Sequence, residues 1–328
     1  MLVINDTAYA GEVASQFISP AVTDSDTVNK GCCYVEDGIK KKKTIPKIDV
    51  SKFMQKRKPT PTPGQGKVQV DGGVLEPQDA MLYYEFDPRD FEQHWIAQQL
   101  PDKLIESELP ATVENFMLMQ TMARLNEFWE SSLWRSRKDY DPEGANVDPT
   151  TKGESADASD FIYFDGWIKK ALDNANTIQI AAPVALTDAN ILAKLALALG
   201  KIPKALLYKY GNAGVKFLMS NADKQKYDNA LIALPNKSID PSQAGVKFYQ
   251  GYNVETLAGM PENTFFVCIC KPDLNSNLWV GMNSVDDNQL QLQRLQANSE
   301  LFFVKGLFKI DTQIGYAEQL VVYTTLVA

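Results

Sequence analysis

The chain has 328 residues, of which 45% are hydrophobic and 23% charged; this is the composition of a globular protein and excludes global disorder. The net charge of −8, from 33 basic and 41 acidic residues, argues against a protein that coats nucleic acid over its whole surface. No apolar run approaches the roughly 18 residues of a membrane span, and residues 1–12 lack the basic and apolar regions of a secretion signal.

The first part of the chain is basic and the remainder is acidic. Residues 1–67 hold eleven basic and seven acidic side chains, so the negative excess lies in residues 68–328. The basic part ends in alternating prolines at Pro59–Gly66, which favour extended backbone and exclude helix. Cys33–Val35 followed by Glu36–Ile39 predicts a strand and a turn. We therefore expect an extended arm and a hairpin here, without a packed core of their own.

Three further elements are predicted between residues 77 and 136. Met81–Phe86 is rich in aromatic residues, as strands are, and Asp90–Leu100 follows a proline and is predicted to be a short helix. Residues 112–135 form the longest predicted helix, with Thr112 as its N-cap. Its apolar residues recur every three or four positions and include Leu118, Met122, Leu125, Trp129 and Leu133. We expect this helix to be covered on more than one side.

The second half mixes short helices and strands. A polar loop is predicted over Arg135–Ser159, and Phe161–Leu172 is a strand or turn that enters a short helix. Capping residues and closing Gly and Pro predict helices from Thr187 to Gly200 and from Ser220 to about Leu234. Strands are expected at 215–219, 246–257, 264–271, 278–282, 301–309 and 314–326, the last two separated by a turn at 311–313. Since the regular alternation of a doubly wound sheet is absent, the predicted fold class is α+β.

The residues that most often carry chemistry form no recognisable motif. The single histidine, His94, has no evident base, orienting group or nucleophile, and a structural role is expected for it. Cys268 and Cys270 lie on one face of a predicted strand. Cys32 and Cys33 could complete a zinc site with them only by long-range coincidence, so buried thiols are expected. We therefore predict no catalytic, cofactor-binding or metal-binding residue and no cofactor.

The lysine run at residues 40–43 has three interpretations. It could contact nucleic acid, pair with an acidic neighbouring subunit, or form a solvated face. A basic segment on an acidic body favours association between copies of one chain over binding to nucleic acid, and a solvated face remains equally compatible. The candidate contacts between subunits are Lys40, Lys41, Lys42, Lys43, Lys56, Arg57 and Lys58.

The order of the segments is itself informative. A basic arm, a hairpin and a long helix precede Phe164–Ile168, Leu186–Leu192, Val215–Ser220, a helix with Tyr227, Gly251–Val254, Gly259–Pro261, Leu301–Lys309 and Ala317–Tyr323. From about residue 30 onward this order resembles that of the major capsid proteins of tailed bacteriophages, the Hong Kong-ninety-seven-type shell fold. It looks most like the versions from phages of Bacteroides-type gut bacteria.

The resemblance implies a wedge-shaped subunit with four parts. These would be an N-terminal arm (1–31), an E-loop hairpin that lies over a neighbour (32–76), a P-domain (77–178 and 286–328) with the helix 112–135 as its spine, and an A-domain (179–285). The A-domain would gather around five-fold and six-fold axes.

The resemblance also implies a function. Such a protein is structural, has no enzymatic activity, and self-assembles through pentamers and hexamers into an icosahedral shell around double-stranded DNA. Its expected partners are copies of itself, a separate scaffolding protein and a portal, with weak non-specific contact to packaged DNA and no membrane. Its expected locations are the virion and, during assembly, the host cytoplasm. The residues before the hairpin are too few to form a scaffold, so we expect the mature shell to keep them or to lose only a short tail.

Other functions remain open from the sequence. An encapsulin-like compartment protein shares the implied fold. A hydrolase or transferase with an acidic α+β core would need a cleft with perturbed titratable groups, and the sequence offers only scattered carboxylates. A monomeric binding module or another virion protein, such as a decoration protein, is a further alternative.

Overall fold

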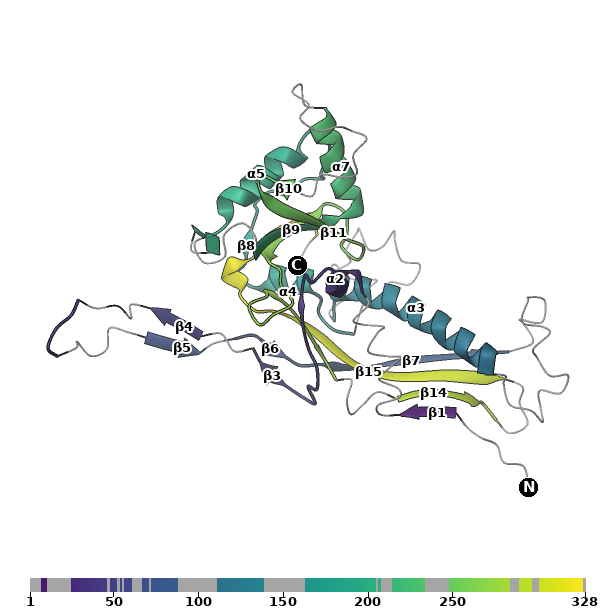
Figure 1. Cartoon of the computed structure of the whole chain (residues 1–328). Helices are drawn as coiled ribbons and strands as arrows, with labels where there is room; N and C mark the ends of the chain where they lie inside the picture. The colour runs from purple at the N-terminus through teal and green to yellow at the C-terminus, as the bar shows by residue number, and fades with distance from the viewer. Residues whose placement is uncertain are drawn as a thin grey trace.

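The computed structural model describes residues 7–10, 25–45, 48–51, 54, 56–60, 67–70, 72–87, 111–138, 163–204, 206–207, 214–233, 248–283, 289–296 and 301–326, with the backbone alone at 7–10, 48–51, 67–70, 111–116 and 289–290. It has two sheets, a long helix and a projecting hairpin (Figure 1). His94, with the helix predicted at 90–100, and most of the predicted loop 135–159 lie outside the described residues.

The first sheet is built around one long strand, β15 (Phe302–Ile314). One side of β15 pairs with β14 (Gln289–Arg294) and β13 (Leu278–Met282), and the other with β7 (Gln78–Phe86), all antiparallel. The sheet continues to β1 (Thr7–Ala10) beside β14 and to β2 (Tyr34–Glu36), which is parallel to β13. Burial alternates along β15 up to Ile310, as expected for a strand with one face covered.

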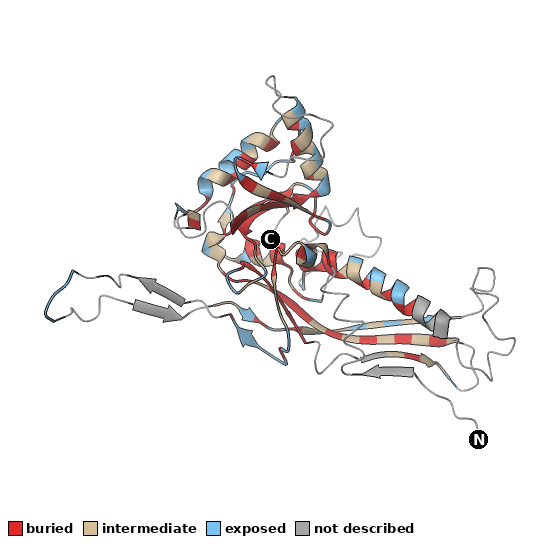
Figure 2. Ribbon diagram, in the orientation of Figure 1, coloured by how far each residue is buried: buried red, intermediate tan, exposed pale blue. Residues whose placement is uncertain are grey.

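The long predicted helix is confirmed as α3 (Ala111–Arg135), which lies along the first sheet (Figure 1). Its apolar stripe faces the core, as the burial colours show (Figure 2). The buried residues of that stripe include Leu118, Leu125, Trp129 and Leu133. Thr112 is not the N-cap, because the helix has already begun at Ala111.

The second sheet has the strand order β10 (Phe248–Tyr249), β11 (Tyr252–Leu257), β9 (Val215–Ser220), β12 (Thr264–Ile269), β16 (Val321–Thr324) and β8 (Ile178–Gln179). Helices α5 (Ile191–Lys201) and α7 (Asn221–Ile232) pack against it, and their apolar residues share one core with its strands. The short helix α4 (Trp167–Asp173) packs against α3 and β15.

Two predicted helix starts had different outcomes. The Ser220 hydroxyl accepts a hydrogen bond from the backbone N–H of Asp223 at 3.1 Å, which confirms the predicted cap of α7. Helix α5 begins four residues after Thr187, with Asn190 at its N-cap position. A turn intervenes because the Asn190 side chain accepts a hydrogen bond from the Thr187 N–H at 2.8 Å.

The turn predicted at residues 311–313 is wrong. Strand β15 runs through these residues to Ile314, and the chain reverses only at Gly315 and the 3₁₀ helix η4 (Ala317–Gln319). Asp311 is buried beside Lys170, and the Thr312 hydroxyl donates to the Asp165 carbonyl at 2.7 Å. Partners distant in the sequence thus satisfy polar groups that would otherwise favour a turn.

Residues 25–45 have no core of their own, but they do not form an extended arm, because they pack into the core of the body. The short helix α2 (Asp26–Asn29) is followed by Cys32 and Cys33, both buried in the core between α3 and the sheets. Strand β2 then pairs with β13, and the Ile39 and Ile45 side chains pack with Leu75 and Trp279. The free part of the hairpin therefore begins after Ile45.

Candidate functional site

All four cysteines of the chain lie in one core. Cys268 and Cys270 are on the same face at the end of β12, with their sulfur atoms 3.4 Å apart, and Cys32 hydrogen bonds with Cys270. Cys33 lies in the same cluster of buried residues. The sequence left open whether Cys32 and Cys33 meet Cys268 and Cys270, and the structure brings them into one core. Within the described ranges, however, no group of three or more His, Cys, Asp and Glu side chains could hold a metal ion.

The environment of Cys32, Cys33 and Cys270 keeps these three thiols protonated. The hydrogen bond with Cys270 and then burial raise the pKa of Cys32 well above its ordinary value. Burial is the main cause of the raised pKa values of Cys33 and Cys270. Since the thiolate is the reactive form, these cysteines serve as small apolar side chains of the core.

The hairpin projects from the body as two short ladders (Figure 1). Near the body β3 (Lys43–Thr44) pairs with β6 (Val74–Leu75), and farther out β4 (Ile48–Ser51) pairs with β5 (Lys67–Val70). Met54, beyond these ladders, is 80% exposed. A two-stranded hairpin is marginally stable in water, so this arrangement calls for a partner along the hairpin.

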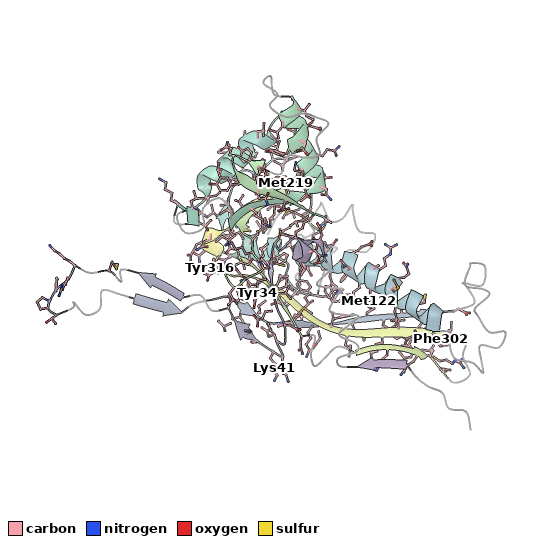
Figure 3. All side chains as sticks on the ribbon, viewed as in Figure 1. Tyr34, Lys41, Met122, Met219, Phe302 and Tyr316 are labelled. Atoms are coloured by element: carbon pink, nitrogen blue, oxygen red, sulfur yellow. The ribbon has the colours of Figure 1, made fainter. Side chains whose placement is uncertain are left out.

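The predicted contact residues fall into two groups on the hairpin. Lys40–Lys43 lie at its root, where Lys43 pairs with Glu36 and Lys42 with Glu76 at 2.9 Å. Lys41 lies at the outer side of this root (Figure 3). Lys56, Arg57 and Lys58 are exposed at the far end of the hairpin, near Met54. The structure therefore brings the seven residues onto one element but not into one patch.

A buried ion pair anchors the hairpin root to the body. Lys170 Nζ lies 2.8 Å from Asp311 Oδ1, and the Glu76 N–H donates to Asp311 Oδ2 at 2.9 Å. The Gln313 side chain donates to the Val74 carbonyl at 2.8 Å. Burial raises the pKa of Asp311 above its ordinary value, and Lys170 opposes that shift. The root is thereby held by charge and hydrogen bonds as well as by apolar packing.

An apolar groove of about 610 Å³ lies between α3 and β7. Its lining includes Met81, Tyr83, Met117, Thr121, Phe128 and Tyr163. Met81 and Tyr83 are on the outward face of β7 and are about half exposed, which is unusual for large apolar side chains of a sheet. Sequence reasoning missed this groove because its two walls, β7 and α3, come from segments that are not adjacent in the sequence. The one available signal was the presence of apolar residues on both faces of β7.

A second group of exposed apolar residues lies on the part of the molecule built on the second sheet. Phe248 on β10 is 59% exposed and Leu197 on α5 is 53% exposed. Ile232, at the end of α7, is exposed to a lesser degree. These side chains lie outside the core that the same elements share.

Comparisons by sequence give no relative: no family model and no curated protein matches the chain. None of the described helices is long and apolar enough to cross a membrane. The comparison of structures, by contrast, finds many matches.

Three similar structures come from phage particles. A chain of the satellite phage P4 procapsid structure, which includes the size determination (Sid) protein, matches with a TM-score of 0.58 and 10% identity over 98% of this chain and 94% of that one. The capsid of cyanophage P-SCSP1u matches with a TM-score of 0.51 and 9% identity over 92% and 89%. A Gordonia phage Cozz chain matches with a TM-score of 0.51 and 10% identity over 92% and 86%. These matches confirm the predicted α+β fold of phage capsid proteins.

Proposed function

We propose that this chain is a structural subunit that self-assembles into the icosahedral shell of a tailed bacteriophage and encloses its double-stranded DNA. The observation that carries the proposal is the extent of the likeness: 98% of this chain aligns with 94% of a chain of the P4 procapsid structure. The proposal requires no catalytic residue, metal or cofactor.

We further propose the four-part division given by the resemblance: an N-terminal arm (1–31), an E-loop (32–76), a P-domain (77–178 and 286–328) and an A-domain (179–285). The packing of residues 25–45 favours a later start for the E-loop, after Ile45. The second sheet with α5 and α7 would form the A-domain, which adds β8 and β16 to the range 179–285 and leaves β13, a strand of the first sheet, to the P-domain. Helix α3 would be the spine of the P-domain.

The hairpin and the groove lie on different surfaces of one molecule. An extended hairpin with an exposed Met54 needs a partner, and the apolar groove between α3 and β7 offers a surface for one. Contact between unlike surfaces of identical chains is heterologous and builds rings when the rotation closes. We propose that the hairpin of one copy lies over α3 and β7 of the next, and that Lys40–Lys43, Lys56, Arg57 and Lys58 contribute to this interface.

The proposal extends to the other partners and to the location of the protein. A separate scaffolding protein and a portal would complete the shell, and the protein would reside in the virion after assembly in the host cytoplasm. Contact with packaged DNA would be weak and non-specific, because the negative charge of the body limits contacts with phosphates. A phage of Bacteroides-type gut bacteria remains the proposed source.

Assembly of the purified chain tests the proposal. We expect pentamers, hexamers or hollow particles in size-exclusion chromatography and negative-stain imaging, because the subunit carries both surfaces of a heterologous contact. A clean monomer of 36.5 kDa with turnover of a generic substrate would favour an enzyme instead. Particles that contain a protein cargo in place of DNA would favour an encapsulin-like compartment.

One variant separates the interface from the fold in the same experiment. Replacement of Lys56, Arg57 and Lys58 by glutamate should reduce particle yield without lowering the stability of the subunit, because all three side chains are exposed. Lys201→Glu, an exposed lysine on α5, is the matched control. Equal particle yields for the two variants would remove the basic tip from the interface.

Limited proteolysis tests the corrected extent of the hairpin. In the unassembled subunit we expect trypsin to cut after Lys56 or Arg57 well before it cuts after Lys30. Lys30 pairs with Asp26 and donates to the Thr256 carbonyl at 2.6 Å, so its backbone is held in the body. Mass spectrometry of the first fragments identifies the sites. Early cleavage at Lys30, or within α3, would contradict this layout.

A further inference from the structure

Glu130 is a buried carboxylate at the centre of the molecule. It lies on α3 and is 4% exposed. Its Oε2 accepts a hydrogen bond from the Thr27 N–H at 3.0 Å, and its Oε1 accepts from the Thr27 hydroxyl at 2.6 Å. Oε1 also accepts from the Gly259 N–H at 3.2 Å. One side chain thus joins three segments that are more than 100 residues apart in the sequence.

The contacts around this carboxylate leave little freedom. A side chain at position 259 would have its Cβ 2.1 Å from the Glu130 carbonyl oxygen, so only glycine permits the turn after β11 to approach α3 this closely. The Trp134 indole N–H donates to the Thr27 hydroxyl at 3.0 Å, which orients that hydroxyl toward Glu130. Each polar group therefore depends on the position of the others.

The segment 25–33 extends this network to both sheets. Asp26 accepts from the Ala258 N–H at 3.2 Å, and the Lys30 ammonium donates to the Thr256 carbonyl, both at the end of β11 in the second sheet. Cys33 is buried and leads directly into β2 of the first sheet. The segment is thus tied to α3 and to the second sheet by polar contacts and continues along the chain into the first sheet.

We infer that Glu130 fixes the orientation of the second sheet relative to α3 through its hydrogen bonds to the segment 25–33 and to the turn at Gly259. We call this set of hydrogen bonds the interlock. The three donors have no other acceptor to replace the carboxylate among the hydrogen bonds of the described residues, and buried donors are costly to leave unpaired.

The consequence for a shell rests on the proposed function. The angle between the two parts of a subunit determines the angle at which neighbours meet, and therefore the curvature of the assembly. Loss of the interlock is expected to broaden the distribution of particle diameters, while the subunits still associate through surfaces that the change leaves intact.

The test compares Glu130→Gln with Glu127→Gln, an exposed residue on the same helix. In Glu130→Gln the new amide group faces a donor, so one buried N–H loses its acceptor. Hydrogen exchange followed by mass spectrometry should show at least about tenfold faster exchange in peptides that cover 25–33 and 256–260. Exchange in α5 and α7 should not change, and Glu127→Gln should match the parent protein.

A second pair of variants tests the same hydrogen bonds from the side of Thr27 if Glu130→Gln does not fold. Thr27→Val removes the hydroxyl that joins Trp134 to Glu130, whereas Thr27→Ser keeps it. The valine variant should show the fast exchange and the serine variant should restore protection. Equal exchange in both, or in Glu130→Gln and the parent, would overturn the interlock.

Particle imaging of the same variants separates the interlock within the subunit from its effect on the curvature of the shell. Faster exchange with a broadened diameter distribution supports both. Faster exchange with an unchanged distribution overturns the link to curvature and keeps the interlock. If the parent protein forms no particles, the proposed function and the curvature link fail together, and hydrogen exchange alone decides the interlock.

Discussion

Replacement of Trp129 by alanine is expected to lower the free energy of unfolding by about 3–5 kcal/mol and to abolish soluble assembly. Trp129 is 1% exposed and lies in the C-terminal half of α3. Its ring lies 6.0 Å from that of Phe308 on β15 and 6.2 Å from that of Phe164, so it fills the space between the helix and the first sheet. Denaturant unfolding of the purified subunit, with size-exclusion chromatography, measures both effects.

Trp129→Phe is the matched control for the size of the cavity. The indole N–H of Trp129 has no hydrogen-bond partner among the described residues, so phenylalanine removes an unsatisfied group while it keeps most of the apolar volume. We expect a loss below about 1.5 kcal/mol for this variant. A loss below about 1 kcal/mol for the alanine variant is the range of surface substitutions and would contradict the role of α3 as the spine.

Local patterns in the sequence predicted the elements well. The spacing of Leu118, Leu125, Trp129 and Leu133 predicted α3 because a helix places such residues on one stripe, and the sheet buries that stripe. The Ser220 cap predicted the start of α7 because its hydrogen bond spans only three residues. The strand that holds Cys268 was predicted from a continuous run of apolar residues, which is also a local property and fits a strand that is buried on both faces.

The sequence could not predict the contacts that join distant segments. The turn at 311–313 was predicted from local polarity, whereas Asp311 is held in a strand by Lys170, more than 100 residues away. The meeting of Cys32 with Cys270 and of Thr27 with Glu130 likewise depends on the packing of α2 between α3 and the second sheet. No periodicity in the chain encodes these pairs.

The sequence predicted only part of the candidate contact surface on the hairpin. Its basic residues were evident as a charge pattern, but the ion pairs of Lys43 with Glu36 and of Lys42 with Glu76 were not. These ion pairs neutralise part of the positive charge at the root of the hairpin within the same chain. The exposed tip, with Lys56 and Arg57, is left as the stronger candidate for contact with a neighbour.

Removal of the Lys170 ammonium should destabilise the subunit by about 3 kcal/mol at pH 7, because it leaves the buried Asp311 carboxylate without its cation. Lys170→Met keeps the apolar length of the side chain and removes the ammonium group, with its charge and its hydrogen bonds to Asp311 and to the Thr312 carbonyl. Lys169→Met is the control on the same helix: its partner Asp173 is half exposed, so a loss below about 1 kcal/mol is expected. Denaturant unfolding of both variants and of the parent gives the comparison.

The pH dependence of this loss identifies Asp311 as its cause. Burial raises the pKa of Asp311 in the folded state above its value in the unfolded chain, and the loss of Lys170 removes the group that opposes this shift. A raised folded pKa contributes stability that is fully present below the unfolded pKa and is lost as the pH rises through the folded pKa. The Lys170→Met variant should therefore differ most from the parent at pH 7 and least near pH 4, where Asp311 takes up a proton.

Asp311→Asn in the Lys170→Met background should recover stability at pH 7, since the amide oxygen still accepts from the Glu76 N–H without a buried charge. A loss that is the same at both pH values, with no recovery by asparagine, would mean that Lys170 acts through packing and not through Asp311.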